Sequence, residues 1–335
     1  MPRVVVAPDK FRGSATAAEA AEAIAGAARD AGVQVDAIPL SDGGEGFSSV
    51  FGGRRRTSRV HDPLRRPVDA VWCELDGGAT AVIEAAAASG LLLVGGPDHN
   101  DPVAASTAGT GELIAAAVKA GARRLIVGMG GSATTDGGWG ALEALEPHSR
   151  LAGVRIEVGC DVETRFLDAA TVFAPQKGAG PAQVELLTRR LERLAQVYRE
   201  RFGVDVTGLI GSGAAGGLAG GLAALGATLR SGFDLVAEHV ELSDRMEGAD
   251  LVITGEGHLD EQSFRGKVVG GVVALAGELG VRVVVLAGGA DPGVDVEHRT
   301  LVGEVGEEAA WADPIGSLKV TAAHLLRDLA SAGDL

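Results

Sequence analysis

The sequence contains little cysteine, and its two cysteines, Cys73 and Cys160, stand far apart without a CxxC pair. A disulfide framework and a cysteine-based zinc site are therefore excluded, and a reducing cytoplasmic setting is expected. Basic residues are also scarce, with 30 lysines and arginines against 45 acidic residues and a net charge of −15. This balance disfavours binding to nucleic acid or to an anionic membrane.

Residues 54–56 form a basic run, but no aromatic residues are interleaved with it, so a solvated edge is expected there.

Long hydrophobic runs are missing as well. The first residues contain no signal-peptide core, so we do not expect secretion. Residues 206–229 are uncharged over the length of a membrane span, but eight of these 24 positions are glycine. With so much glycine, moving this stretch from water into a bilayer would gain little free energy. The stretch therefore predicts a glycine-rich loop that leads into a buried helix.

The usual motifs for nucleotide binding and hydrolysis are absent or weak. The sequence has no GxxxxGK[ST], no GxSxG and no HExxH. A GxGxxG occurs at Gly211, Gly213 and Gly216, but a tract so rich in glycine produces this spacing by chance, and no convincing combination of strand and acidic residue follows at the distances of a dinucleotide fold.

What is present is an alternation of short apolar runs with alanine-rich helical stretches, which predicts an α/β protein with mainly parallel sheets. A length of 335 residues favours two domains. Thr16 and Glu19 form a capping box that predicts a helix ending at Gly32. Residues 52–67 break the pattern and are predicted to be a crossing between domains. Strands are expected at 4–7, 33–40, 68–75, 80–84, 125–127, 154–158, 251–254 and 283–287, and further helices at 112–120, 181–201 and 317–331.

Glycine is abundant, with 51 residues, and five loops combine it with carboxylates or lysine. Glycines expose backbone N–H groups that cradle phosphate, and carboxylates hold magnesium or take a proton from a hydroxyl. Together such loops indicate phosphoryl transfer, although each alone could be a tight turn. The five loops are DKFRGS (9–14), SDGGEG (41–46), GGSATTDGG (130–138), PQKGAG (175–180) and TGEGHLDEQSFRGK (254–267).

The lysines concentrate in these loops. Only five of the 30 basic residues are lysine, and three of them, Lys10, Lys177 and Lys267, lie in the glycine loops. Lysine presents a compact point charge where arginine presents a broad fork, so these three are candidate functional residues. The other two are predicted to lie on helix surfaces.

These loops, with STAGTGELI (106–114), VGMGGSATTDGG (127–138), CDV (160–162) and GSGAAGGLAGGL (211–222), resemble the bacterial glycerate kinase family. The blocks run in order from residue 3 to about residue 290. The resemblance implies an ATP- and Mg2+-dependent kinase that phosphorylates D-glycerate to 2-phosphoglycerate. It also implies two α/β domains: a Rossmann/flavodoxin-like domain of residues 1–50 plus 245–335 and an inserted domain of residues 51–244, with the active site in the cleft between them.

The resemblance also implies roles for individual residues. Asp161 would accept or orient the proton of the acceptor hydroxyl, Asp42 and Lys267 would join it in catalysis, and Glu45 and Glu256 would hold magnesium. The expected substrate- and nucleotide-binding residues are Lys10, Ser14, Gly43, Gly44, Ser132, Thr134, Asp136, Lys177, Gly213, Gly216, Gly217 and Ser263. The expected partners are D-glycerate and ATP, with no nucleic acid and no membrane, and the expected assembly is a monomer or homodimer.

The chain departs from the family pattern around CDV. Only residues 139–159 separate GGSATTDGG from CDV, and the stretch Glu163 to Leu167 is also short. Two alternatives therefore stay open. The acceptor could be another small hydroxy acid, or the protein could bind nucleotide without turnover.

Overall fold

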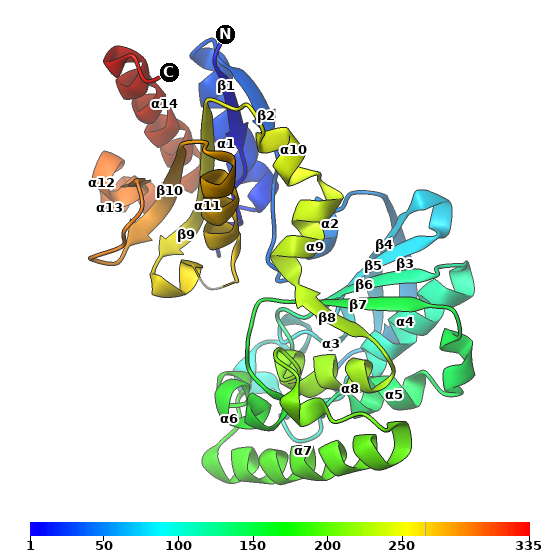
Figure 1. Cartoon of the computed structure of the whole chain (residues 1–335). Helices are drawn as coiled ribbons and strands as arrows, with labels where there is room; N and C mark the ends of the chain where they lie inside the picture. Colours follow the sequence, from blue (N-terminus) through cyan, green and yellow to red (C-terminus); the bar gives the residue numbers. More distant parts are fainter. Residues whose placement is uncertain (265) are drawn as a thin grey trace. The chain divides into compact units, whose positions relative to one another are not determined.

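The computed structural model describes residues 1–264 and 266–335. The chain divides into two compact units (Figure 1): Met1–Asp42 with Phe233–Leu335, and Gly43–Gly232. Both units combine a sheet with packed helices, and the first is assembled from both ends of the chain. The predicted fold class is therefore confirmed.

The first unit contains a five-stranded sheet in the order β11-β10-β9-β1-β2, with every pair parallel. Val4, Val5 and Val6 are completely buried, as expected for a central parallel strand covered on both faces. The strands are β1 (Arg3–Val6), β2 (Gln34–Ala37), β9 (Leu251–Leu259), β10 (Val283–Ala290) and β11 (His298–Thr300).

Helices cover both faces of this sheet. One core joins α1 (Ala17–Asp30) and α14 (Pro314–Ala332) to the strands, and α11 (Val268–Leu279) packs in a separate cluster with Val285. The predicted capping box begins α1: Glu19 N donates to Thr16 Oγ1 at 3.2 Å, and Thr16 N donates to Glu19 Oε2 at 2.9 Å. The remaining helices are α9 (Gly232–His239), α10 (Leu242–Met246), α12 (Leu301–Val305) and α13 (Glu307–Ala312).

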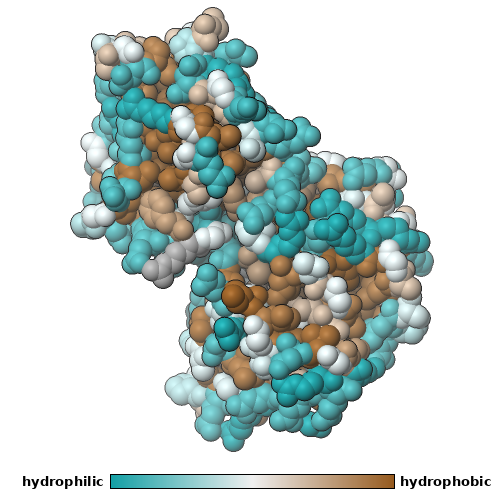
Figure 2. Space-filling model, viewed as in Figure 1, coloured by the Kyte–Doolittle hydropathy of each residue, from teal (hydrophilic) through white to brown (hydrophobic). Residues whose placement is uncertain are grey.

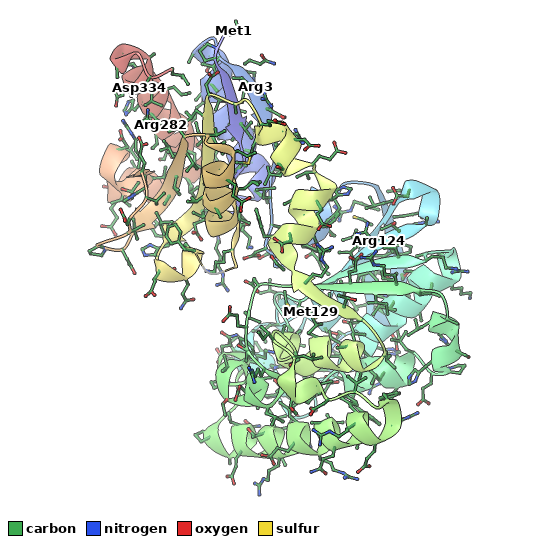
Figure 3. All side chains as sticks on the ribbon, viewed as in Figure 1. Met1, Arg3, Arg124, Met129, Arg282 and Asp334 are labelled. Carbon is green, nitrogen blue, oxygen red and sulfur yellow. The ribbon has the colours of Figure 1, made fainter. Side chains whose placement is uncertain are left out.

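Polar contacts tie both chain ends to the first unit. Arg3 N donates to Asp250 Oδ2 at 2.7 Å. Near the other end, Arg282 Nη1 donates to Asp334 Oδ2 at 3.1 Å, and Figure 3 labels these side chains. The two ends of the sequence therefore form one folded unit with β9 and β10.

The second unit contains a six-stranded sheet in the order β3-β4-β5-β6-β7-β8. Strands β3, β4 and β5 pair antiparallel, and β5 to β8 pair parallel. The strands are β3 (Arg54–His61), β4 (Pro67–Leu75), β5 (Thr80–Glu84), β6 (Arg124–Gly128), β7 (Arg155–Cys160) and β8 (Thr228–Ser231).

One sequence prediction is wrong in this unit. Residues 52–67 are predicted to cross between domains, but they lie within the second unit, where Arg54–His61 forms the edge strand β3, which pairs with β4 over its whole length. The charged side chains that concealed the strand are typical of an edge, where they discourage pairing with another chain. The arginines were expected on a solvated edge, and Arg54 and Arg55 are indeed exposed there.

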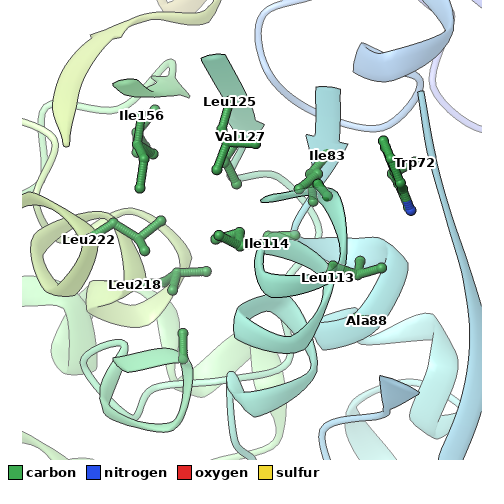
Figure 4. Packing of buried hydrophobic residues seen from close by; sticks show 14 of the residues in the cluster. Trp72, Ile83, Ala88, Leu113, Ile114, Leu125, Val127, Ile156, Leu218 and Leu222 are labelled. Atoms are coloured by element: carbon green, nitrogen blue, oxygen red, sulfur yellow. The ribbon is translucent and has the colours of Figure 1, made fainter. Parts of the chain in front are cut away.

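Four helices cover one face of the second sheet. Figure 4 shows Leu113 and Ile114 near Ile83, Leu125 and Val127, with Leu218 and Leu222 on the side of Ile156. The helices are α3 (Ala86–Ser89), α4 (Ala108–Ala120), α5 (Trp139–Ala144) and α8 (Leu218–Ala224). Every residue of α8 is buried, which confirms the predicted buried helix. In the described residues, no helix is long and apolar enough to cross a membrane.

An outer layer packs on these helices. The predicted charged helix is α7 (Pro181–Phe202), whose buried residues Leu187, Leu191, Ala195 and Tyr198 meet α6 (Ala169–Phe173). The short helix α2 (Phe47–Val50) follows the start of the unit. The short 3-10 helices of the second unit are η1 (Asp76–Gly78), η2 (Leu92–Val94), η3 (Pro97–His99), η4 (His148–Leu151), η5 (Phe166–Asp168), η6 (Pro175–Lys177), η7 (Val206–Gly208) and η8 (Ala214–Gly217). A further 3-10 helix, η9 (Glu261–Phe264), belongs to the first unit. Figure 2 shows hydrophilic residues around much of the rim of each unit, in keeping with the charged composition.

Candidate active site

In the first unit, the loops that follow β1 and β2 bring Asp9, Lys10 and Asp42 together. Lys10 Nζ lies 3.7 Å from Asp9 Oδ1 and 3.6 Å from Asp42 Oδ1. The backbone fixes this arrangement, because Asp9 N donates to Gly255 O at 2.9 Å and Lys10 N donates to Asp9 Oδ1 at 2.7 Å. The cluster follows the carboxyl ends of parallel strands, where open α/β sheets bind their ligands.

Asp9 was not among the residues predicted for the site. Its side chain is buried, and burial followed by the charge of Asp42 raises the pKa of its carboxyl to about 7, against the opposing charge of Lys10. The sequence signal was available, since Asp9 immediately precedes Lys10 in a glycine loop after a buried strand. A buried carboxyl with a strongly shifted pKa beside other charged groups is typical of a functional site.

Ser14 belongs to the same loop. Phe11 pairs with Ala15 in a short antiparallel bridge, and Ser14 N donates to Phe11 O at 2.8 Å. Gly13 has a φ of 76°, which allows this tight return of the chain before α1 begins. Ser14 therefore lies at the tip of a compact turn.

Glu256, on β9, forms a second acidic position in the first unit. Burial raises the pKa of its carboxyl, while a hydrogen bond with Ser263 and the charge of Lys267 oppose the shift. Glu256 Oε1 is buried without a hydrogen-bond partner, which leaves a carboxylate oxygen available to a ligand. Lys267 occupies the N-cap position of α11, and Ser263 N donates to Asp260 Oδ1 at 3.0 Å.

These oxygens have the chemistry that magnesium prefers, because Mg2+ binds through one or two carboxylates together with waters and phosphate oxygens. Among residues 1–264 and 266–335, no three or more His, Cys, Asp or Glu residues are grouped to hold a metal ion by themselves. The unpartnered oxygen of Glu256 fits a metal that arrives with phosphate and water as its other ligands.

In the second unit, the loop after β6 meets the loop that contains Lys177. Lys177 Nζ donates to Ser132 Oγ at 2.9 Å and to Thr134 O at 2.6 Å. Only 3% of Lys177 is exposed, and burial lowers the pKa of its amino group to about 7, with the charge of Asp136 opposing. Three of the predicted binding residues are therefore in one contact network.

Asp136 fixes the shape of the same loop. Its carboxylate accepts hydrogen bonds from Thr107 N at 2.8 Å, Thr107 Oγ1 at 2.9 Å, Gly138 N at 3.1 Å and Gly140 N at 3.2 Å. Burial raises the pKa of Asp136, and these hydrogen bonds oppose the rise. Because its carboxylate already accepts four hydrogen bonds from the protein, Asp136 is a positioning residue. It attaches the loop to the starts of α4 and α5.

Asn100 is a further residue that the sequence did not reveal. Its Nδ2 donates to Ala133 O at 3.0 Å and to Lys177 O at 2.8 Å, so it joins the two loops from outside either one. Its Oδ1 is buried without a partner. No local motif marks this residue, because its contact with Lys177 spans 77 positions.

The glycines at the start of the second unit pack closely against these loops. Gly130 N donates to Gly43 O at 3.1 Å, and a Cβ on Gly130 would lie 2.5 Å from the Cα of Gly44. A Cβ on Gly43 would lie 3.0 Å from Gly159 O. The first glycines of the SDGGEG loop are therefore held against the carboxyl ends of β6 and β7, and Glu45 beside them is exposed.

The glycine-rich tract of residues 211–217 packs against the same loop. Gly216 has a φ of 66°, and a Cβ on it would lie 2.0 Å from Thr134 O. Gly217 would meet the Cα of Gly137 at 2.8 Å, and Gly213 would meet Arg165 O at 2.4 Å. These glycines permit backbone to pack on backbone beside the Lys177 network.

Asp161 follows directly after β7, at the strand end that Gly43 approaches. It is half-buried and lies next to Cys160. Burial, together with the charge of Asp161, raises the pKa of the Cys160 thiol to about 11. Cys160 is therefore a neutral thiol, and Asp161 is the acidic group at this strand end.

An α/β protein whose glycine-rich loops carry a buried lysine, clustered carboxylates and tightly packed glycines has the features of a phosphotransferase. The model of the glycerate kinase family matches residues 4–149 and 146–332. The chain belongs to the glycerate kinase family, and the predicted enzyme class, a kinase, is confirmed.

Individual relatives agree with this assignment. The glycerate kinase of Bacillus subtilis (strain 168) is 39% identical over 324 residues, covering 85% of each chain. The glycerate 2-kinase of Escherichia coli (strain K12) is 37% identical over 335 residues, covering 89% of this chain and 88% of the relative. A crystal structure described as glycerate kinase 2 from Salmonella typhimurium LT2 matches with a TM-score of 0.85 and 34% identity, covering 100% of both chains.

Proposed function

We propose that this kinase transfers the γ-phosphoryl group of ATP to D-glycerate, giving 2-phosphoglycerate and ADP. The observation that carries the proposal is the placement of Lys10 with Asp9 and Asp42 in the loops that follow β1 and β2, together with the hydrogen bond from Lys177, in η6, to Ser132 in the loop that follows β6. Phosphoryl transfer needs fixed positive charge for the phosphate oxygens and a group that takes the acceptor proton. Relatives named glycerate kinase and glycerate 2-kinase support the choice of acceptor.

In the proposed reaction, an oxygen of the acceptor hydroxyl forms a bond to the γ-phosphorus while the bond from that phosphorus to the bridging oxygen of ADP breaks. Asp161 takes or orients the hydroxyl proton. Asp42, in the first unit, is a further catalytic residue. Lys10 and Lys267 neutralise charge on phosphate or carboxylate oxygens. The backbone and hydroxyl donors of the loops at residues 43–44, 130–138 and 211–217 position the substrates.

Glu256 in the first unit and Glu45 in the second are each proposed as residues that would hold magnesium, which when bound neutralises phosphate charge and orients the transferred group. The unpartnered oxygen of Glu256 supports its part in this assignment. Reduced cysteines and the proposed use of ATP favour a cytoplasmic location.

The proposal is tested by measuring ADP release with Mg-ATP across a panel of small hydroxy acids. We expect release with D-glycerate that requires magnesium, and a product that enolase uses directly. Release with another acid but not with D-glycerate would change the assigned acceptor. Nucleotide binding without release for any acid would show a protein that has lost turnover.

A further inference from the structure

The second unit contains a cavity that is lined by none of the residues given a role in the proposed reaction. Its volume is about 430 Å³, within the range of sites that bind small molecules. Its walls come from α2 and the glycines beside it, from β3, β4 and β5, and from α3. The residues that carry its polar chemistry are Gly46, Ser48, Ser49, Arg55, Cys73 and Glu84.

Glu84 is already occupied by protein donors. Its Oε1 accepts hydrogen bonds from Ser48 N at 2.8 Å and Ser48 Oγ at 2.7 Å, and its Oε2 accepts from Gly46 N at 3.3 Å. This carboxylate therefore fixes the wall formed by α2. Cys73 adds a neutral lining, because burial raises the pKa of its thiol.

The serine hydroxyls of the cavity are arranged as acceptors. Ser48 Oγ donates its proton to Glu84, and Ser49 Oγ donates its proton to Gly46 O at 2.6 Å. A hydroxyl has one proton and two lone pairs, so each serine oxygen keeps the ability to accept a hydrogen bond from a ligand. These oxygens favour a ligand that carries hydroxyl groups.

Arg55 supplies the positive charge. It pairs in register with Cys73, so its side chain lies on the sheet face that bears the cavity, while Arg56 faces the other side and pairs with Glu74. In the part of the chain that the structure describes, the Arg55 guanidinium has no hydrogen bond or ion pair. A guanidinium is suited to binding a carboxylate through two parallel hydrogen bonds.

We propose that this cavity binds a small hydroxycarboxylic acid, with Arg55 pairing with its carboxylate and Ser48 and Ser49 accepting hydrogen bonds from its hydroxyl groups. The proposal rests on the proposed function only in the choice of D-glycerate as the first probe. The bound acid has one of two sources: it is the acceptor of the phosphoryl group, or it is a second molecule that acts as an effector.

The test is calorimetric titration of the purified chain, without nucleotide, with D-glycerate, propionate and glycerol. We expect D-glycerate to bind more tightly than propionate, which lacks hydroxyls, and glycerol, which lacks the carboxylate. Arg55→Leu should weaken D-glycerate binding at the cavity by about 10-fold or more, because it removes a charge-assisted pair. Arg54→Leu, on the opposite sheet face of the same strand, is the matched control and should bind as the wild type.

Ser49→Ala provides a second variant in a different element. It should weaken D-glycerate binding and leave propionate binding unchanged. Circular dichroism and urea unfolding establish that each variant is folded. Equal D-glycerate affinity and stoichiometry in the wild type, Arg55→Leu and Ser49→Ala would overturn the proposal.

Kinetics distinguish the two sources of the bound acid. A higher KM for glycerate in Arg55→Leu with unchanged kcat identifies the acceptor. An unchanged KM, with a fall from two bound acids to one, identifies the effector. Because the titration needs no turnover, binding that depends on Arg55 without any kinase activity would contradict the proposed function alone.

Discussion

Lys177 Nζ donates a hydrogen bond to Ser132 Oγ at 2.9 Å and so joins two glycine-rich loops that are 45 positions apart in the sequence. The lysine is buried, and Asn100 Nδ2 donates a hydrogen bond to the backbone oxygen of Lys177. The pair therefore places an amino group and a hydroxyl in fixed positions at the end of β6. This relationship connects the packing of the second unit with the proposed chemistry.

Lys177→Met should change how stability depends on pH. Burial lowers the pKa of Lys177 from 10.5 to about 7, so between these values the unfolded chain binds a proton that the folded chain has lost. The free energy of unfolding of the wild type should therefore rise with pH across this window, relative to the variant, by up to about 1.4 kcal/mol per pH unit. Urea unfolding at several pH values measures the difference.

The matched control is Lys119→Met, at the exposed end of α4, which should unfold with the pH dependence of the wild type. A constant difference between Lys177→Met and the wild type from pH 7 to pH 10 would show that Lys177 stays charged in the folded protein.

Asp9→Asn should remove an ionisation near neutral pH. Because the pKa of Asp9 is raised from 3.8 to about 7, the folded chain holds a proton between these values that the unfolded chain has lost. The contribution of Asp9 to the free energy of unfolding therefore falls as pH rises through this window, and the variant should lack that fall. Above pH 7, where Asp9 is charged in the folded protein, turnover should also decrease by roughly 100-fold, because Lys10 loses the charge of one of its two carboxylate partners.

Urea unfolding and turnover, each measured from pH 5 to pH 9, check this prediction, with the exposed Asp30→Asn on α1 as the control. If Asp9→Asn keeps both the turnover and the pH profile of the wild type, Asp9 has no part in the reaction.

Gly216→Ala should destabilise the second unit. The positive φ of Gly216 is unfavourable for alanine, and the new Cβ would lie 2.0 Å from the carbonyl oxygen of Thr134. We expect a loss of about 2 kcal/mol or more in the free energy of unfolding. Gly208→Ala is the control, because a Cβ there meets nothing within 4 Å. Equal urea midpoints for both variants would contradict this prediction and would mean that the loops shift to make room for the added methyl group.

Asp161→Asn should separate turnover from nucleotide binding. The amide keeps the shape of the side chain but cannot take the acceptor proton, so turnover should fall by roughly 100- to 10,000-fold. ATP affinity should be retained, because the loops and lysines would bind the nucleotide. Asp168→Asn, an exposed acidic position in η5, is the control. A parallel loss of turnover and ATP affinity would instead make Asp161 a ligand of the nucleotide or its metal.

The local sequence patterns predict much of the fold. Buried valines predict β1, the capping box of Thr16 and Glu19 predicts the start of α1, and the glycine-rich tract predicts a buried α8. The pattern failed at β3, because an edge strand needs no apolar alternation and its arginines resemble a loop. The strand β3 is formed by its pairing with β4, and this pairing between two segments cannot be recognised in the sequence of either segment alone.

The candidate site was predictable only in part for the same reason. Lys10 and Lys177 stood out because lysine is rare here and both lie in glycine loops. Asn100 and Thr107 lie outside those loops and gain their importance from contacts with Lys177 and Asp136. Asp9 lay within a recognised motif, but only burial reveals the shift in its pKa.

The central claim is most directly tested by identifying the product formed from ATP, magnesium and D-glycerate with 31P and 1H nuclear magnetic resonance. The account predicts that 2-phosphoglycerate and ADP accumulate in equal amounts, and that neither forms when D-glycerate is left out. Formation of inorganic phosphate without a phosphorylated acid, or of 3-phosphoglycerate as the first product, would contradict it.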